Sequence, residues 1–150
     1  MPGYKPHLAV AAASGGGVLT GLYWFGYYKP EPMLMAALMA VTLMAALFPD
    51  VDTHSKGRKI YYALMACVDI VLMINKQYQW AAALGFAAML PAVGDHRGWT
   101  HTWWAMLSVP LVLLGIPLVF YQYPWKPLVP FYCAAILGYF THLALDKKFV

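Results

Sequence analysis

Charged residues are scarce in this chain. Only 11% of its 150 residues are Asp, Glu, Lys or Arg, whereas 62% are hydrophobic. A soluble globular domain carries roughly 25% charged and about 45–50% apolar residues. So few charges cannot cover the surface of a soluble domain of this length. The composition therefore excludes an ordinary soluble domain and predicts a single integral membrane domain spanning residues 1–150.

Cysteine is also rare. Cys67 and Cys133 both lie inside apolar segments, and neither belongs to a CxxC or Cys/His finger spacing. This excludes a thiolate zinc finger and a dithiol redox site, and we expect both side chains to be small core residues. No arginine-rich run or stacking motif accompanies the surplus of Lys and Arg, so no nucleic-acid partner is expected.

Long apolar runs predict an all-α fold, a polytopic bundle of about six short transmembrane helices. The apolar segments cover about 8–28, 33–48, 60–74, 78–93, 102–121 and 128–145. Several are nearer 16 residues, whereas roughly 20 are usually needed to cross a ~30 Å hydrocarbon core, so two of them can instead be re-entrant. Prolines at 30, 32, 49, 124 and 127 separate segments, and Pro110 and Pro117 are expected to kink the fifth. Gly15–Gly17 allows a second helix to approach closely or, alternatively, locally loosens the first segment; we expect the close approach.

The basic residues divide unequally between the two sets of connections. Seven lie on the side of the N-terminus and three on the other; the first set is Lys5, Lys56, Arg58, Lys59, Arg97, Lys147 and Lys148, and the second is Lys29, Lys76 and Lys126. The positive-inside rule then places both termini in the cytoplasm.

The histidines gather on that same side. All five, together with four of the six acidic residues, fall at these segment ends; they are His7, Asp50, Asp52, His54, Asp95, His96, His101, His142 and Asp146. Loops are polar because water reaches them, but this explains Lys and Arg better than it explains every histidine. Clustered ionisable groups at a membrane indicate a functional site, and imidazole and carboxylate groups indicate a metal.

Two pairs carry this interpretation. His142 and Asp146 share one face of an expected helix and can ligate one ion, or simply hydrogen-bond to each other. Asp50 and Asp52 can point the same way in an extended turn, where two carboxylates repel unless a cation or proton lies between them. The alternative for the second pair is an Asp-rich turn or helix cap.

The segment from Asp95 to Thr102 adds further candidates. Gly98 permits a turn that brings His96 and His101 together, and Arg97 can bind a phosphate through two hydrogen bonds. Thr100 and Thr102 can hydrogen-bond the ligands from behind.

Four residues are assigned less directly. His7 lies just before the first segment and is a candidate ligand. His54 can be a ligand, a proton shuttle or a solvated loop residue. Asp95 stays undecided. Asp69, in the middle of an apolar segment, can face a polar cavity or pair with Lys76 or Lys126, and we assign it no catalytic role.

Three blocks of the sequence resemble a known family. Leu47–Asp52, His96–Thr102 and Gly138–Asp146, together with His7, are similar to the signature blocks of the YdjM-type (LexA-regulated) inner-membrane metal-dependent hydrolases. Two departures are visible: Thr102 stands where the family usually has serine, and the given sequence ends soon after Asp146, without the C-terminal extension of many relatives. The resemblance implies an inner-membrane location and a metal site formed by His7, Asp50, Asp52, His96, His101, His142 and Asp146, with Arg97 beside it. Because the family is distantly similar to zinc phospholipase C enzymes and nucleases, it implies a reaction class rather than a substrate.

The sequence therefore predicts a metal-dependent hydrolase of phosphoesters, such as phospholipids or lipid-linked phosphates, working at the membrane surface with membrane lipids as partners. Seven ligands suit two divalent ions, with Zn²⁺ expected and Mn²⁺ or Fe²⁺ possible, bridged by Asp50 or Asp52. Arg97 would stabilise phosphoryl charge, and His54 would protonate the leaving group. Lys56, Arg58 and Lys59 would attract anionic headgroups. The alternative is a non-catalytic metal-binding membrane protein, either a structural subunit or a transporter.

Overall fold

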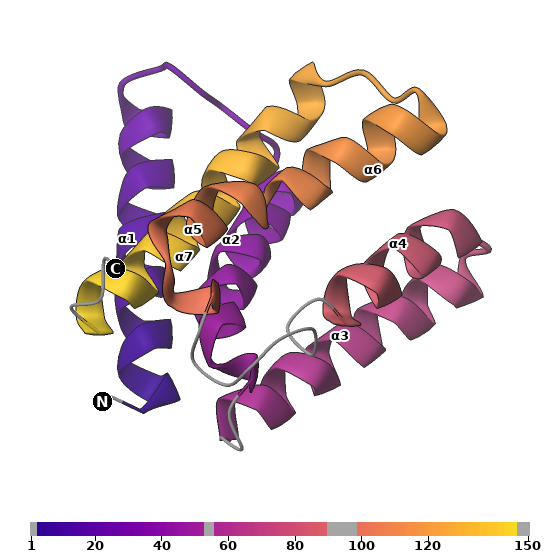
Figure 1. Cartoon of the computed structure of the whole chain (residues 1–150). Helices are drawn as coiled ribbons and strands as arrows, with labels where there is room; N and C mark the ends of the chain where they lie inside the picture. Colours follow the sequence, from indigo (N-terminus) through magenta and orange to yellow (C-terminus); the bar gives the residue numbers. More distant parts are fainter. Residues whose placement is uncertain (1–2, 53–55, 90–98, 147–150) are drawn as a thin grey trace.

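The computed structural model describes residues 3–52, 56–89 and 99–146, and every regular element in these ranges is helical (Figure 1). The order is α1 (Tyr4–Trp24), α2 (Pro32–Leu47), the 3₁₀ helix η1 (Phe48–Asp52), α3 (Lys56–Ile74), α4 (Tyr78–Met89), η3 (Trp99–His101), α5 (Trp103–Ser108), α6 (Leu111–Tyr121), η4 (Lys126–Leu128) and α7 (Val129–Asp146). The expected all-α class is confirmed.

Prolines set several of the boundaries. Pro32 opens α2, where its missing N–H is not needed. Pro110 is the N-cap of α6, so the fifth apolar segment, in which a kink was expected, is divided there into α5 and α6, and Pro117 lies inside α6. The first helix differs from expectation because α1 begins at Tyr4, which places His7 inside its first turn and not before it. Pro6 permits this, because proline is tolerated within the first turn of a helix.

Helices α1, α2 and α7 form the centre of the molecule, and α7 crosses against both α1 and α2 (Figure 1). Small residues allow the helices to approach. A Cβ atom added at Gly15 would lie 3.1 Å from both Met39 Sδ and Thr42 Cγ2. One added at Gly138 would overlap the backbone carbonyl of Thr42. The close approach expected at Gly15–Gly17 is therefore found at Gly15, and a tighter one occurs at Gly138.

Helices α3 and α4 pack on each other as a hairpin that extends away from this centre (Figure 1). The hairpin is anchored at the start of α3, where the buried ring of Tyr61 packs edge-on against Phe48 of η1. Phe48 in turn contacts the ring of Tyr139 in α7. This aromatic cluster fixes η1 against α7, which matters because η1 carries Asp50.

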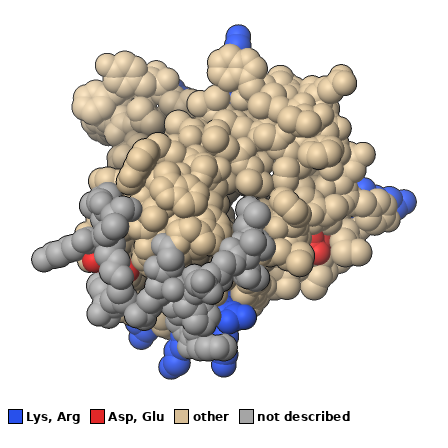
Figure 2. All heavy atoms as spheres, viewed as in Figure 1, with Lys and Arg blue, Asp and Glu red and all other residues tan. Residues whose placement is uncertain are grey.

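Three stretches in the described ranges are long and apolar enough to cross a membrane: Pro32–Val51, Trp103–Tyr121 and Lys126–Asp146, of 20, 19 and 21 residues. Large apolar side chains within the second stretch, such as Val119 and Phe120, are mostly exposed. On the face that Figure 2 shows, Lys and Arg gather mainly at the lower end, where α1 and α3 begin, and most of the other coloured surface is uncharged.

The expectation for the two cysteines is wrong. Cys67 in α3 and Cys133 in α7 are both exposed free thiols and not core side chains. In a membrane-spanning bundle an apolar segment presents much of its surface to lipid, so an apolar neighbourhood in the sequence does not imply burial.

Candidate metal centre

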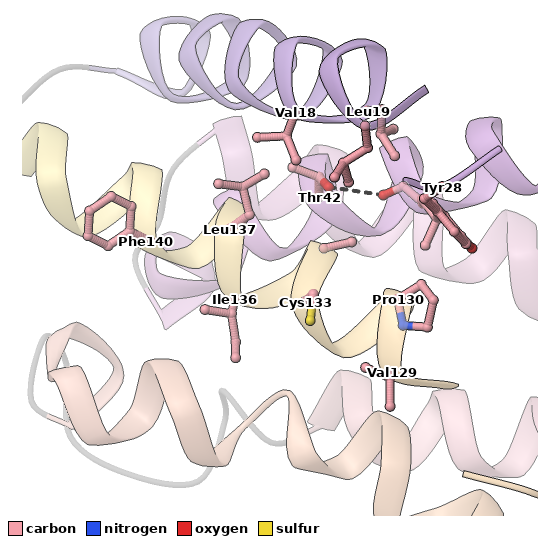
Figure 3. Close-up of a pocket in the computed structure, with 14 residues that line it drawn as sticks. Val18, Leu19, Tyr28, Thr42, Val129, Pro130, Cys133, Ile136, Leu137 and Phe140 are labelled. Atoms are coloured by element: carbon pink, nitrogen blue, oxygen red, sulfur yellow. Dashed lines mark hydrogen bonds between the residues drawn. The ribbon is translucent and has the colours of Figure 1, made fainter. Parts of the chain in front are cut away.

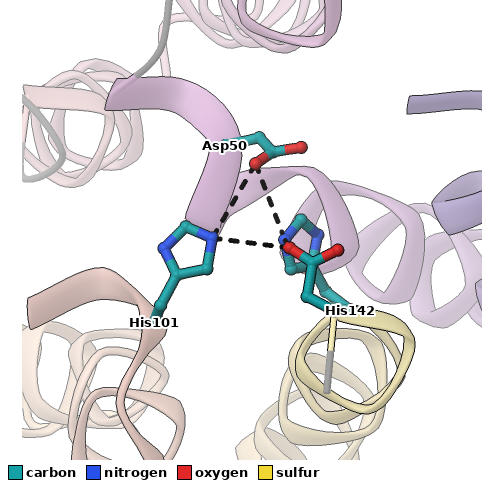
Figure 4. A group of neighbouring side chains, drawn as sticks. Asp50, His101 and His142 are labelled. Carbon is teal, nitrogen blue, oxygen red and sulfur yellow. Dashed lines mark ion pairs between the residues drawn. The ribbon is translucent and has the colours of Figure 1, made fainter. Parts of the chain in front are cut away.

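Four elements meet at one end of the helical centre: the first turn of α1, η1 at the end of α2, η3, and the last turn of α7. They bring together five side chains from the predicted ligand set, which are His7, Asp50, His101, His142 and Asp146. Residues far apart in the sequence thus share one site. In Figure 4 Asp50, His101 and His142 turn their polar atoms toward one another.

The geometry of the central group is compact. His142 Nε2 lies 3.7 Å from Asp50 Oδ1 and 3.5 Å from Asp146 Oδ2. His101 Nε2 lies 3.8 Å from the same two oxygens. One donor atom from each of these four residues lies within 4.8 Å of all the others. The four residues therefore form a group able to hold a metal ion.

His7 lies on the other side of Asp146. Its ring stacks on that of His142, with the centroids 4.0 Å apart and the planes inclined by 15°. Its Nε2 is 3.4 Å from Asp146 Oδ1. The two oxygens of Asp146 thus face different partners: Oδ1 faces His7, and Oδ2 faces His101 and His142.

The backbone of α2 orients His142. Nδ1 of His142 lies 2.7 Å from the carbonyl oxygen of Ala46, which can only accept a hydrogen bond. The proton of a neutral His142 therefore resides on Nδ1, and the lone pair of Nε2 points at Asp50 and Asp146. A second hydrogen bond of this kind is how proteins fix the tautomer and ring orientation of a metal-binding histidine.

Thr100 orients His101 in the same sense. Its hydroxyl donates to the carbonyl of Pro49, 3.4 Å away, and Oγ1 lies 3.2 Å from His101 Nδ1. Because the hydroxyl has one proton, its oxygen must accept from Nδ1–H, which again leaves the Nε2 lone pair facing the carboxylates. Tyr139 holds this segment in place by donating its hydroxyl to the carbonyl of Thr100.

The site contains several buried polar atoms without a hydrogen-bond partner. Among the described residues these include both nitrogens of His7, Nε2 of His142 and both carboxylate oxygens of Asp146. A buried acceptor that lacks a donor costs about 1–3 kcal/mol, and more if it is charged. Converging lone pairs and carboxylates need a positive charge between them, so this donor set fits a divalent cation. Mixed nitrogen and oxygen donors suit Zn²⁺, Mn²⁺ or Fe²⁺.

The remaining candidate site residues lie partly or wholly outside the part of the chain that the structure describes. The backbone of Asp52 belongs to η1, but its side chain, and all of His54, Asp95, His96 and Arg97, lie outside the described residues. Their assignments stay predictions from the sequence.

Three expectations need correction. Asp50 and Asp52 lie on a 3₁₀ helix and not in an extended turn, because Phe48–Asp52 continues directly from α2. The Thr102 hydroxyl does not support a ligand; it donates to the carbonyl of Trp99 and accepts from the backbone N–H of Ala105, so it caps α5. Asp69 forms no ion pair with Lys76 or Lys126 within the described ranges, and its Oδ1 is buried without a hydrogen-bond partner.

Sequence reasoning identified Thr100 as a support behind the ligands, and its hydrogen bond with His101 confirms this, but it did not identify the other supports. The carbonyl oxygens of Ala46 and Pro49 leave no trace in side-chain chemistry, so no sequence signal could have singled them out. Tyr139 carried a weak signal, because it lies three residues before His142 in the same block.

Replacing Thr100 by valine is expected to weaken metal binding by about 10–100-fold, the usual effect of removing a group that orients a ligand. The valine has nearly the same volume but leaves His101 Nδ1 without its partner. A competition titration against a chromophoric chelator measures the change. Thr100→Ser keeps the hydroxyl and should bind nearly as tightly as the unmodified protein. Equal affinities for the valine and serine variants would contradict this role for Thr100.

Comparison with known families agrees with this geometry. A family model for the YdjM inner membrane protein matches residues 1–147, nearly the whole chain. The chain belongs to the YdjM inner membrane protein family. YdjM proteins are described as metal-dependent hydrolases, and here the matched region contains the whole His/Asp cluster. Neither a curated protein nor a solved structure matches the chain.

Proposed function

We propose that the protein is a membrane-embedded, metal-dependent hydrolase of phosphoesters, such as phospholipids or lipid-linked phosphates. The observation that carries the proposal is the buried nitrogens of His7 and His142 and the buried carboxylate of Asp146, which lack hydrogen-bond partners and converge with Asp50 and His101 at one end of the bundle. A divalent ion bound there supplies Lewis-acid activation of water and of a phosphoryl oxygen.

The ligand set can serve two ions through Asp146. Its Oδ2 faces the group formed by Asp50, His101 and His142, whereas its Oδ1 faces His7. We infer that Asp146 is the carboxylate placed to be shared, instead of Asp50 or Asp52. With Asp52 and His96, which the sequence adds to the set, the donors are too many for one tetrahedral ion.

Access to the site is one-sided. The side chains of His7, His142 and Asp146 are almost fully buried, whereas that of Asp50 is 21% exposed. The open edge therefore lies at Asp50 in η1, and a phosphoryl group approaches there. In the sequence His54 follows η1 and Arg97 precedes η3. We therefore retain Arg97 as the phosphate-binding residue and His54 as the proton donor. An open edge favours catalysis over a closed structural site.

We assign the site to the cytoplasmic face of the inner membrane. The basic side chains that gather where α1 and α3 begin support this orientation (Figure 2). The same residues, Lys56 and Lys59 among them, are exposed and would attract anionic headgroups toward the open edge.

The test is hydrolysis by detergent-purified protein prepared without chelator. With Zn²⁺ or Mn²⁺ added, we expect cleavage of a soluble aryl phosphodiester and of a phospholipid in mixed micelles. His101→Ala should reduce the rate by about 100-fold or more, because it removes a ligand, whereas Asp69→Asn, which changes an acid outside the site, should not.

The alternative function is a structural metal site that only joins helices. The observation in its favour is that the ligands come from four separate elements, which a bound ion would hold together. Stoichiometric metal without cleavage of either substrate would support this staple and contradict the hydrolase. Activity retained in His101→Ala would contradict the assigned site.

A further inference from the structure

A large cavity lies between α1, α2 and α7, and its volume is about 560 Å³ (Figure 3). Its walls include Gly15 and Leu19 of α1, Leu38 and Thr42 of α2, and Cys133 and Phe140 of α7. We call it the inter-helix groove. Its size falls within the roughly 300–1,000 Å³ of ordinary ligand sites.

The groove is lined almost entirely by apolar atoms. No charged side chain contributes to it. Thr42 is polar, but its hydroxyl donates to the carbonyl of Leu38, 3.0 Å away, while its methyl group faces Gly15. Such a lining provides neither donors nor acceptors for a polar ligand, so it selects hydrocarbon.

The groove and the metal centre lie along the same helices, because α1 and α7 carry ligands, α2 leads into η1 with Asp50, and all three helices line the groove. Thr42 precedes Ala46, the partner of His142, by one helical turn. Phe140 precedes His142 by two residues, and Gly15 lies about two turns after His7. From the end nearer the metal centre, which Gly15, Thr42 and Phe140 line, the groove follows α7 as far as Val129.

The length of the groove matches one leaflet. At ~1.5 Å per residue, the eleven steps along α7 from Val129 to Phe140, the first and last residues of this helix that line the groove, correspond to about 17 Å. Half of a ~30 Å hydrocarbon core is about 15 Å. A chain lying in the groove with its head at the metal centre would therefore reach roughly to the middle of the bilayer, as the acyl chain of a phospholipid does. A long polyprenyl chain would extend well past its end.

The groove is open along its side. Val18 and Phe140, on opposite walls, are 47% and 46% exposed, and Cys133 is exposed as well. Cys133 and Phe140 lie within Lys126–Asp146, one of the stretches long and apolar enough to cross a membrane. An acyl chain can therefore enter sideways from the surrounding leaflet without passing through water.

We propose that the inter-helix groove binds one acyl chain of a membrane phospholipid and thereby places the phosphate of that lipid at the metal centre. The position of the headgroup rests on the proposed function, whereas the binding of the chain does not. The substrate would then be a phospholipid from the leaflet that surrounds the groove. Binding of its acyl chain would select this lipid over soluble phosphoesters, which have no such chain.

Photo-crosslinking tests chain binding without relying on activity. The protein is treated with chelator and placed in nanodiscs that contain a small fraction of phosphatidylglycerol with a diazirine in one acyl chain. After irradiation, labelled peptides are mapped by mass spectrometry. We expect groove residues around Cys133 to be labelled about tenfold more than the exposed apolar segment Ile70–Ile74 of α3. Roughly two additional buried methylene groups suffice for such a preference.

A groove-filling substitution provides the matched variant. Ala134 lines the groove, and Ala66 is exposed on α3. Ala134→Trp should abolish the preferential labelling, and Ala66→Trp should leave it unchanged. Equal labelling of the groove and α3 in the unmodified protein would overturn the proposal. So would a disulfide-linked Cys133–Cys133 dimer without groove labelling, because a second copy would then cover the groove.

A kinetic comparison separates this inference from the proposed function. Ala134→Trp should reduce the ratio of kcat/KM for a dioleoyl phospholipid to that for a dihexanoyl analogue by about tenfold or more, while Ala66→Trp leaves both values unchanged. Metal-dependent cleavage with no difference between long and short chains would overturn the groove and leave the hydrolase intact. Preferential labelling of the groove in a protein that binds no metal would support the groove and contradict the hydrolase.

Discussion

Asp146→Asn is expected to stabilise the metal-free protein and destabilise the metal-loaded one. Without a cation, Asp146 is a buried carboxylate close to Asp50, because both lie within 4 Å of His101 Nε2. Neither oxygen of Asp146 has a hydrogen-bond partner. Asparagine removes the like-charge repulsion between the two acids. A gain of about 1 kcal/mol would raise the Tm by roughly 2–4 °C in a protein of this size.

In the metal-loaded protein the same substitution removes a charged ligand. If metal affinity falls by about 100-fold, the stabilisation contributed by saturating metal falls by about 2.7 kcal/mol. The corresponding loss in Tm is roughly 5–11 °C. Thermal unfolding in detergent, measured with chelator and again with excess Zn²⁺, gives both numbers on the same preparation.

The change of sign separates a cation site from an ordinary His–Asp pair. If Asp146 only paired with His142 in the folded protein, asparagine would lower the Tm under both conditions. Asp69→Asn is the control, because Asp69 is also an acid within an apolar helix and lies outside the cluster. It should shift the Tm by the same amount with and without metal.

Gly138→Val is expected to separate α2 from α7 and thereby disrupt the site. The first atom of any side chain at Gly138 would overlap the carbonyl carbon and oxygen of Thr42. A helix backbone cannot yield as a flexible side chain can, so the destabilisation should reach or exceed about 3 kcal/mol, the upper end of the usual range for overpacking. Because α2 leads into Asp50 and α7 carries His142 and Asp146, metal binding should be lost as well.

Gly17→Ala provides the matched control. Gly17 also lies within a helix of the central group, but a Cβ atom added there would meet nothing within 4 Å. Alanine should be neutral, or stabilise the helix by up to about 1 kcal/mol. Thermal unfolding and metal content measure both variants. A Gly138→Val protein with unchanged Tm and full metal content would show that α2 and α7 are not packed as described.

The sequence predicted the features that depend on local pattern. Proline positions anticipated the start of α2 and the break between α5 and α6. The spacing of His142 and Asp146 anticipated a pair on one face of a helix, and their nitrogen and oxygen atoms are 3.5 Å apart. The grouping of histidines at one set of segment ends anticipated that α1, η1, η3 and α7 would meet there.

Features that depend on packing could not be predicted in the same way. From the sequence, Asp50 and Asp146 are equivalent candidate ligands. Only the packing of α7 against α1 and α2 shows that one oxygen of Asp146 faces His7 and the other faces His101. The exposure of Cys67 and Cys133 also depends on which helix faces meet. The groove requires the crossing of three helices, and its lining is ordinary apolar sequence.

The central claim is that side chains from separate helices hold a shared divalent cation. Anomalous X-ray scattering from crystals of the protein, prepared without chelator and measured at the zinc, manganese and iron absorption edges, tests it most directly. We predict an anomalous peak enclosed by Asp50, His101, His142 and Asp146. Crystals with ordered density for these four side chains and no anomalous peak among them, or a peak located elsewhere in the chain, would contradict the account.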